Sequence, residues 1–77
     1  MISIKNFTAI IEKEDDGYVA LCPELDIASQ GDTIEEAKVN LHEAIELFFE
    51  HASKDEIDYR LKNDIFITNM QIAVGKA

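Results

Sequence analysis

The sequence predicts an α+β fold with the element order β-β-β-α-β, in which one helix packs on a small, mainly antiparallel sheet. Three observations lead to this fold class. The first part of the chain contains short segments of alternating apolar residues separated by turn signals. A long segment in the middle repeats its apolar residues every three or four positions, which is typical of an amphipathic helix. One more alternating segment follows near the C-terminus.

The first part of the chain predicts a three-stranded meander. In the first turn, we expect the dipeptide Asp16-Gly17 to take the positive φ angles of a tight hairpin. Pro23 ends the second strand, because proline has no amide hydrogen to donate to a neighbouring strand. The expected strands are Ile4–Lys13, Tyr18–Cys22 and Ile27–Gln30.

The helix is expected to begin after Thr33 and to run to about His51. The Thr33 hydroxyl can accept the amide hydrogen of Glu36, and the Glu36 carboxylate can reach back to the amide of Thr33. This reciprocal arrangement is a capping box. One side of the helix is apolar and the other is charged, so the helix must cover an apolar surface. The residues expected on the apolar side are Ile34, Ala37, Leu41, Ala44, Ile45, Phe48 and Ala52.

The C-terminal part of the chain is less regular. Residues 53–64 are mostly polar and are expected to form either a loop or one further helical turn. Ile65–Val74 alternates and is expected to form the fourth strand. One helix can cover only one face of the sheet, but the predicted strands are apolar on both faces. The uncovered face or an edge strand is therefore an interface, and we expect a homo-oligomer.

Length and charge limit the function classes. The 77 residues are expected to form one domain, 1–77, with a thin core. A net charge of −9, from 7 Lys+Arg and 16 Asp+Glu, repels nucleic acid and attracts a basic protein. No apolar run approaches the ~20 residues of a membrane span, and no signal peptide is recognised. We therefore expect a cytoplasmic protein that binds neither DNA nor membranes.

No group of residues predicts catalysis, and no metal or cofactor is expected. The acidic run at 12–16 invites a metal site, but it lies in a hairpin turn and lacks the ligand spacing of an EF-hand loop. His42 and His51 are expected on different sides of the helix, so they do not form a paired ligand site. Cys22 ends an apolar strand, which favours a packed and unreactive thiol. These observations favour a binding protein over an enzyme.

Four short runs of the chain carry a resemblance to a known family, and they are Asp16 to Ala20, Pro23-Glu24-Leu25, Ser29 to Ala37 and Asn40 to Ile45. Together these runs resemble the HicB antitoxin family. The likeness covers the chain closely from Phe7 to Phe49 and extends loosely over the last predicted strand. It implies a partial RNase H-like fold, in agreement with the predicted element order. It also implies an antitoxin that neutralises a small basic, mRNA-cleaving, HicA-like toxin by covering its RNA-binding surface.

The sequence departs from the HicB pattern in two places. Fuller members of that family carry a C-terminal DNA-binding domain, whereas this sequence stops at Ala77, soon after the last predicted strand. We therefore expect a single HicB-like domain without a DNA-binding domain. The segment between Leu25 and Gln30 also lacks the longer Pro-Gly-containing loop of many members, which leaves the contacts of this loop open.

Partner contacts are expected at acidic turns, because carboxylates can occupy the cationic groups with which an RNA-cleaving protein holds phosphates. Tyr18 could add an aromatic anchor. An alternative is that these acids are only solvated and that an apolar edge binds the partner. A stand-alone regulatory or interaction module without a toxin is the alternative function. The candidate partner-binding residues are Glu14, Asp15, Asp16, Tyr18, Glu24 and Asp26.

Overall fold

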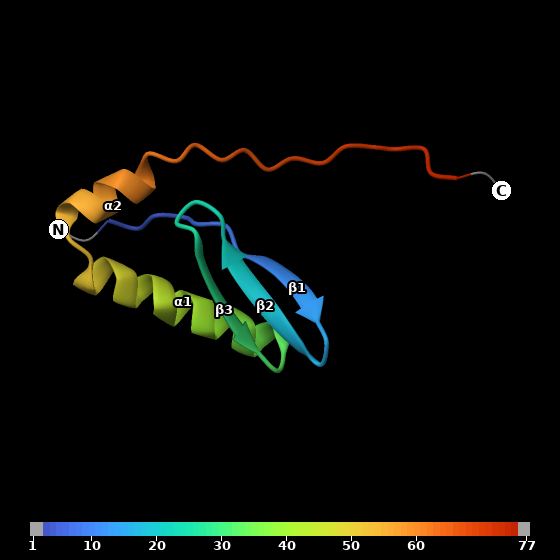
Figure 1. Ribbon diagram of the computed structural model, residues 1–77, viewed down its shortest axis with the longest axis horizontal. Coiled ribbons are helices and arrows are strands. Elements are labelled where there is room, and N and C mark those ends of the chain that lie inside the picture. The colour runs from blue at the N-terminus through green and yellow to red at the C-terminus, as the bar shows by residue number, and fades with distance from the viewer. Residues whose placement is uncertain (1–2, 76–77) are drawn as a thin grey trace.

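Three strands and two helices make up the part of the chain that the computed structural model describes, residues 3–75. The strands form one antiparallel sheet in the order β1-β2-β3, and the long helix α1 lies across one face of it (Figure 1). The α+β class and the meander are therefore confirmed. The elements are β1 (Ile10–Glu14), β2 (Gly17–Cys22), β3 (Ile27–Gly31), α1 (Ile34–His51) and α2 (Lys54–Leu61).

The β1–β2 hairpin turns one residue earlier than predicted. Glu14 pairs with Gly17, so the two residues in the turn are Asp15 and Asp16. Asp15 takes the positive φ, at 53°, which a short aspartate side chain tolerates. Gly17 instead belongs to β2, where a Cβ would lie only 2.9 Å from the carbonyl oxygen of Gly31. The glycine therefore permits close approach of two strands.

The first strand is shorter than the predicted Ile4–Lys13 segment. β2 ends at Cys22, directly before Pro23, and residues that precede Ile10 consequently have no ladder partner in the sheet. This N-terminal segment still contacts the folded core. The Phe7 ring lies 5.8 Å from the Phe49 ring of α1, measured between centroids.

Helix α1 begins and ends where the sequence predicted. Thr33 Oγ1 accepts the amide hydrogen of Glu36 at 3.0 Å, as expected for the N-cap. The Glu36 carboxylate, however, accepts from the amide of Asp32 at 3.0 Å and not from that of Thr33. Gly31 allows the helix to start close to β3, because a Cβ there would lie 2.5 Å from the backbone nitrogen of Ala37.

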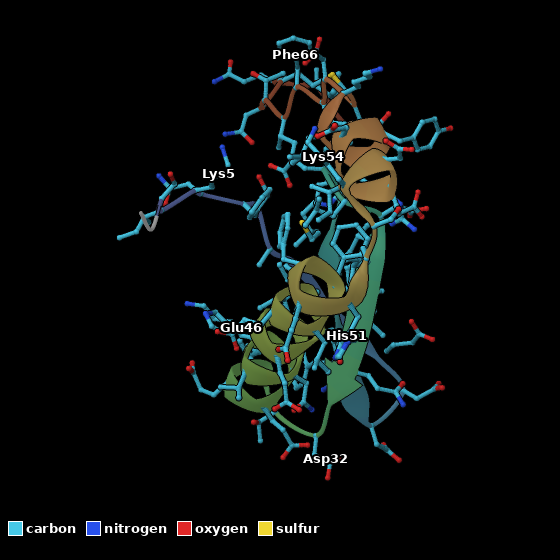
Figure 2. All side chains as sticks on the ribbon, turned by 90° about the vertical axis from the view of Figure 1, so that its left-hand side faces the viewer. Lys5, Asp32, Glu46, His51, Lys54 and Phe66 are labelled. Carbon is cyan, nitrogen blue, oxygen red and sulfur yellow. The ribbon has the colours of Figure 1, made fainter. Side chains whose placement is uncertain are left out.

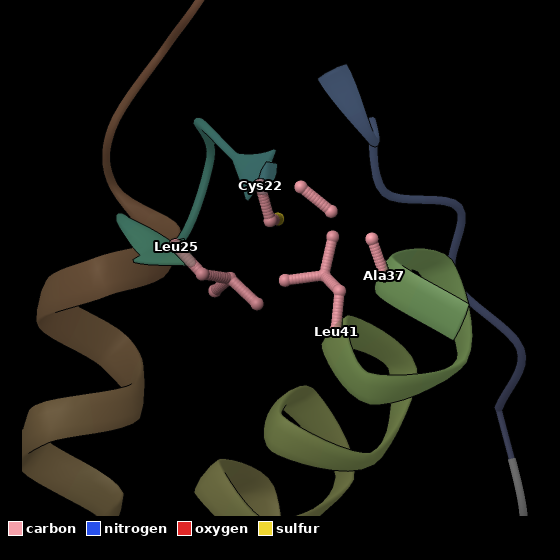
Figure 3. Packing of buried hydrophobic residues seen from close by; sticks show 5 residues of the cluster. Cys22, Leu25, Ala37 and Leu41 are labelled. Carbon is pink, nitrogen blue, oxygen red and sulfur yellow. The ribbon is translucent and has the colours of Figure 1, made fainter. Parts of the chain in front are cut away.

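The fully buried core is small and lies between β2, the β2–β3 turn and the first half of α1 (Figure 3). Partly buried aromatic and aliphatic side chains surround it. Ile34, which was expected on the apolar side of the helix, is 48% exposed because it stands at the helix start, beyond the core. The buried residues are Ala20, Cys22, Leu25, Ala37 and Leu41.

Residues 53–64 include a second helix, the eight-residue α2, which is longer than the single turn expected as one alternative. Ser53 caps it by accepting the amide hydrogen of Glu56 at 3.1 Å. Arg60 attaches the helix to the rest of the protein, since its guanidinium donates to the carbonyl oxygen of Leu25 and lies 5.1 Å from the centre of the Phe48 ring. The Arg60 side chain thus connects α2 to the β2–β3 turn and to α1.

The predicted fourth strand is not part of the sheet. Ile65–Val74 is extended, pairs with no strand among residues 3–75, and runs away from the domain after α2 (Figure 1). Its side chains are exposed, with Phe66 at 89% and Met70 at 83%. The expected order β-β-β-α-β is therefore wrong for the single chain. The alternating pattern correctly indicated an extended backbone, but pairing requires an edge within reach, and α2 directs the segment elsewhere.

Candidate functional site: an acidic groove at the hairpin end

The β1–β2 hairpin and the connection from β3 to α1 lie at the same end of the sheet (Figure 1). An acidic groove is formed there. Because the meander is antiparallel, these two connections come to the same end of the sheet. We call this surface the hairpin-end groove. Its carboxylates come from three elements of the sequence, the hairpin, the β3–α1 connection and the first turn of α1. They are Glu14, Asp15, Asp16, Asp32 and Glu36, and the groove is also lined by Gly17, Tyr18, Val19, Gln30 and Gly31.

The carboxylates of the groove differ in what they already bind. One carboxylate oxygen of Glu36 already accepts a hydrogen bond within the protein, from the amide of Asp32. Asp15, Asp16 and Asp32 are exposed, and Asp32 projects from the lower end of the molecule in Figure 2. No ion pair among residues 3–75 involves a carboxylate of this groove. The negative charge there is consequently available to a cationic partner.

Tyr18 gives the groove an aromatic wall. It lies on β2 opposite Lys13 on one side and Gly31 on the other, and it is half-buried against the core. The structure thus brings together four of the predicted partner-binding residues. Two lining acids were missed, Asp32 and Glu36. They stand in the capping sequence of α1, and the antiparallel order of the predicted strands was the signal that could have placed them beside the hairpin.

Glu24 and Asp26 lie in the β2–β3 turn, at the opposite end of the sheet from the hairpin-end groove. They therefore do not form one surface with Asp15 and Asp16. Asp26 is exposed and has a positive φ of 55°. Glu24, in contrast, binds within the protein. Its carboxylate accepts from the hydroxyl of Thr8 at 2.6 Å and from the Thr8 amide at 3.1 and 3.2 Å.

The environment of Glu24 alters the titration of two side chains. Desolvation by itself would raise the pKa of Glu24, but the hydrogen bonds to its carboxylate, with the Thr8 hydroxyl foremost, together outweigh it, and the pKa lies below its usual value. The Cys22 thiol is fully buried, and its Sγ lies 3.5 Å from a carboxylate oxygen of Glu24. Burial, with a contribution from the neighbouring carboxylate, raises the pKa of Cys22. The thiol is therefore neutral and packed, as the sequence predicted.

Other candidate chemistry is not assembled into a site in the described part of the chain. Between residues 3 and 75, no three His, Cys, Asp or Glu side chains are placed to hold a metal ion. His42 lies on the exposed side of α1, with Nδ1 3.3 Å from a carboxylate oxygen of Glu46. His51 is likewise exposed and has Nε2 3.9 Å from the carboxylate of Glu50. Neither helix of the described chain has the length and apolarity needed to cross a membrane.

These features define a small α+β protein built on a three-stranded meander, with an acidic groove at one end. The chain belongs to the UPF0150 family. A UPF0150 protein of Helicobacter pylori (strain J99) is 41% identical over 66 residues, which cover 84% of this chain and 92% of the relative. The family name assigns no activity.

Two UPF0150 proteins of Synechocystis (strain PCC 6803) are similar over a shorter stretch. One is 57% identical over 49 residues, covering 61% of this chain and 62% of that protein. The other is 56% identical over 50 residues, covering 62% of this chain and 69% of that protein. No family model matches the chain. No solved structure matches it either.

Proposed function

We propose that this chain is a cytoplasmic, non-enzymatic antitoxin-like binding module that neutralises a small basic, mRNA-cleaving toxin of the HicA-like kind. The hairpin-end groove is the proposed contact surface. The observation that carries the proposal is the convergence of carboxylates from separate segments, to which no cation of residues 3–75 is paired. The resemblance of the sequence to HicB antitoxins supports the same role, together with a partial RNase H-like fold.

The proposed mechanism is competition for phosphate-binding groups. A protein that cleaves RNA must hold a polyanion, so it presents cationic side chains around its active surface. Asp15, Asp16 and Asp32 can occupy those cations, and Tyr18 can pack beside them as an apolar anchor. The net charge of −9 steers a basic partner towards the protein before contact. Occupation of the cationic surface would leave it closed to RNA.

A matched pair of charge reversals tests the proposal. The test variant carries Asp15→Lys, Asp16→Lys and Asp32→Lys, and all three residues are exposed at the groove. The control carries Glu43→Lys, Glu46→Lys and Glu50→Lys, all on the exposed side of α1. Both variants replace three acids with lysine, so their net charge changes by the same amount. Both variants and the wild type are used to capture basic proteins from the native host. Their association rates with the captured protein are then measured over a range of ionic strength.

We expect the groove variant to lose capture and the control to retain most of it. Association of the wild type is expected to slow as salt rises, because charge steering is screened over about 10 Å at 0.1 M salt. Equal capture by both variants, with an association rate that does not respond to salt, would rule out the groove as the contact surface. A protein that captures no basic RNA-cleaving partner at all favours the alternative function, a stand-alone interaction module.

A further inference from the structure

Ile65–Val74 is a ten-residue segment without a single charged side chain, in a protein of which 30% of residues are charged. It contains no glycine or proline, and Phe66, Met70, Ile72 and Val74 would share one face of an extended backbone. Figure 1 shows it extended beyond the domain, and in Figure 2 Phe66 lies at the opposite end of the molecule from Asp32. The segment cannot bury its exposed apolar side chains by itself, and a neighbouring strand would both cover them and pair with its backbone.

Helix α2 fixes the position at which the N-terminal end of this segment leaves the domain. Arg60 donates to the carbonyl oxygen of Leu25, contacts the Phe48 ring, and lies 3.5 Å from the carboxylate of Glu56. Only residues 62–64 separate α2 from the extended segment. The segment is therefore presented from a fixed point and directed away from its own sheet.

The outer edge of β1 is free to pair with such a segment. In a hairpin with a two-residue turn, the residues that flank the turn exchange hydrogen bonds and the pattern then alternates. Glu14, Glu12 and Ile10 therefore bond to β2, and the backbone groups of Ile11 and Lys13 point outwards. No strand pairs with β1 on that side among residues 3–75.

The opposite edge of the sheet is partly occupied. The same alternation turns the backbone of Gln30 away from β2, towards the free side of β3. Its carbonyl oxygen there accepts a hydrogen bond from the side-chain amide of Asn40, at 2.8 Å. A strand added to β3 would have to displace this contact, so β1 is the better acceptor.

We propose that two copies of this chain form a symmetric dimer by exchanging Ile65–Val74, each copy adding this segment to the β1 edge of the other. In a dimer with a two-fold axis, the segment of each copy pairs with the β1 edge of the other, so neither segment and neither edge is left without a partner strand. Each sheet then gains the fourth strand that the sequence pattern predicts, supplied by the second copy. The inference goes beyond the proposed toxin binding and holds independently of it.

Proline substitutions test the exchange on both sides. The double substitution Thr68→Pro with Gln71→Pro disables the segment. The backbone amides of an odd and an even position point to opposite sides of a strand, so one of these two amides must donate to the receiving β1 edge, and proline has no amide hydrogen. Its control is Thr68→Ala with Gln71→Ala. Lys13→Pro disables the edge by removing an outward amide, and Lys13→Ala is its control. The segment variant leaves the rest of the fold intact, since residues 65–74 are exposed and pair with no strand.

Light scattering across micromolar concentrations measures the outcome without any toxin. We expect the wild type and both alanine controls to have twice the 8.7 kDa mass of one chain. Each proline variant should dimerise at least about tenfold more weakly, while the helical signal in circular dichroism, which comes from α1 and α2, stays unchanged. An equimolar mixture of the two proline variants should recover a heterodimer, because one partner keeps an intact segment and the other an intact edge. A monomeric wild type, or a segment variant that still dimerises fully, would overturn the exchange.

Discussion

The Glu24 carboxylate joins the segment before β1 to the β2–β3 turn, through hydrogen bonds to both the hydroxyl and the amide of Thr8. Glu24→Gln keeps the size of the side chain but removes its charge and one acceptor. We expect it to lower the free energy of unfolding by about 1–2 kcal/mol. Asp26→Asn, in the same turn but exposed, should change it by less than about 0.5 kcal/mol. Urea denaturation compares the two, and equal effects would contradict the role assigned to Glu24.

The pH dependence of stability should also report on Glu24. Its pKa is lower in the folded protein than in the unfolded chain, because the hydrogen bonds to its carboxylate, chiefly from Thr8, outweigh desolvation. The resulting stabilisation is complete above the unfolded value of about 4.3 and is lost as the pH falls through the folded pKa. The wild type should therefore lose more stability than Glu24→Gln between neutral pH and about pH 3. Parallel curves for the two proteins would show that Glu24 does not contribute.

Gly31 is required by the close contact between β3 and the start of α1. A methyl group there would lie 2.5 Å from the backbone nitrogen of Ala37, and backbone atoms cannot move aside cheaply. We expect Gly31→Ala to lower the free energy of unfolding by about 1–3 kcal/mol. The exposed neighbour substitution Gln30→Ala serves as the control and should be nearly neutral. A neutral Gly31→Ala variant would mean that the helix start can shift.

At the scale of elements, α2 depends on Arg60 for its attachment to the domain. The helix has no fully buried residue of its own, so the bond to the Leu25 carbonyl and the contact with Phe48 hold it. Arg60→Ala should increase amide hydrogen exchange throughout α2 and leave exchange in β2 and α1 unchanged. Lys62→Ala, just after the helix, is the control. Exchange that rises equally over the whole domain would show that α2 and the core unfold together.

Local signals explain why some elements were predicted closely. The bounds of α1 follow from its cap at Thr33 and from the spacing of its apolar residues, and both act within a few turns of the helix. The first turn was misplaced by one residue because Asp-Gly is a strong local turn signal. Gly17 is instead required by the close approach of the Gly31 carbonyl oxygen, at the far end of β3, and this contact forms only when the sheet has assembled.

At the scale of the whole molecule, net charge should decide which polymers the protein avoids. With a charge of −9 and acids both at the hairpin-end groove and along α1, the chain should not bind double-stranded DNA at physiological salt. A gel-shift titration measures this, and the wild type should leave the DNA free at every concentration. A sequence-specific shift by this chain alone would contradict the prediction.

The candidate site was predicted in part, for a reason that belongs to the whole fold. Glu14, Asp15, Asp16 and Tyr18 are close in sequence, so any hairpin at that place brings them together. Glu24 and Asp26 were grouped with them because they also lie in an acidic turn. Successive turns of an antiparallel meander, however, point to opposite ends of the sheet. The same geometry brings Asp32 and Glu36 to the groove.

The sequence by itself determined the meander, the capped helix and the acidic character, because strand alternation, helix capping and charge are properties of neighbouring residues. The tertiary structure decided how far β1 extends, where the turn acids meet, and what becomes of Ile65–Val74. An alternating pattern makes a segment extended, but pairing depends on which edge is within reach. Here the contact of Arg60 with Leu25 orients α2, and α2 sends the segment away from its own sheet.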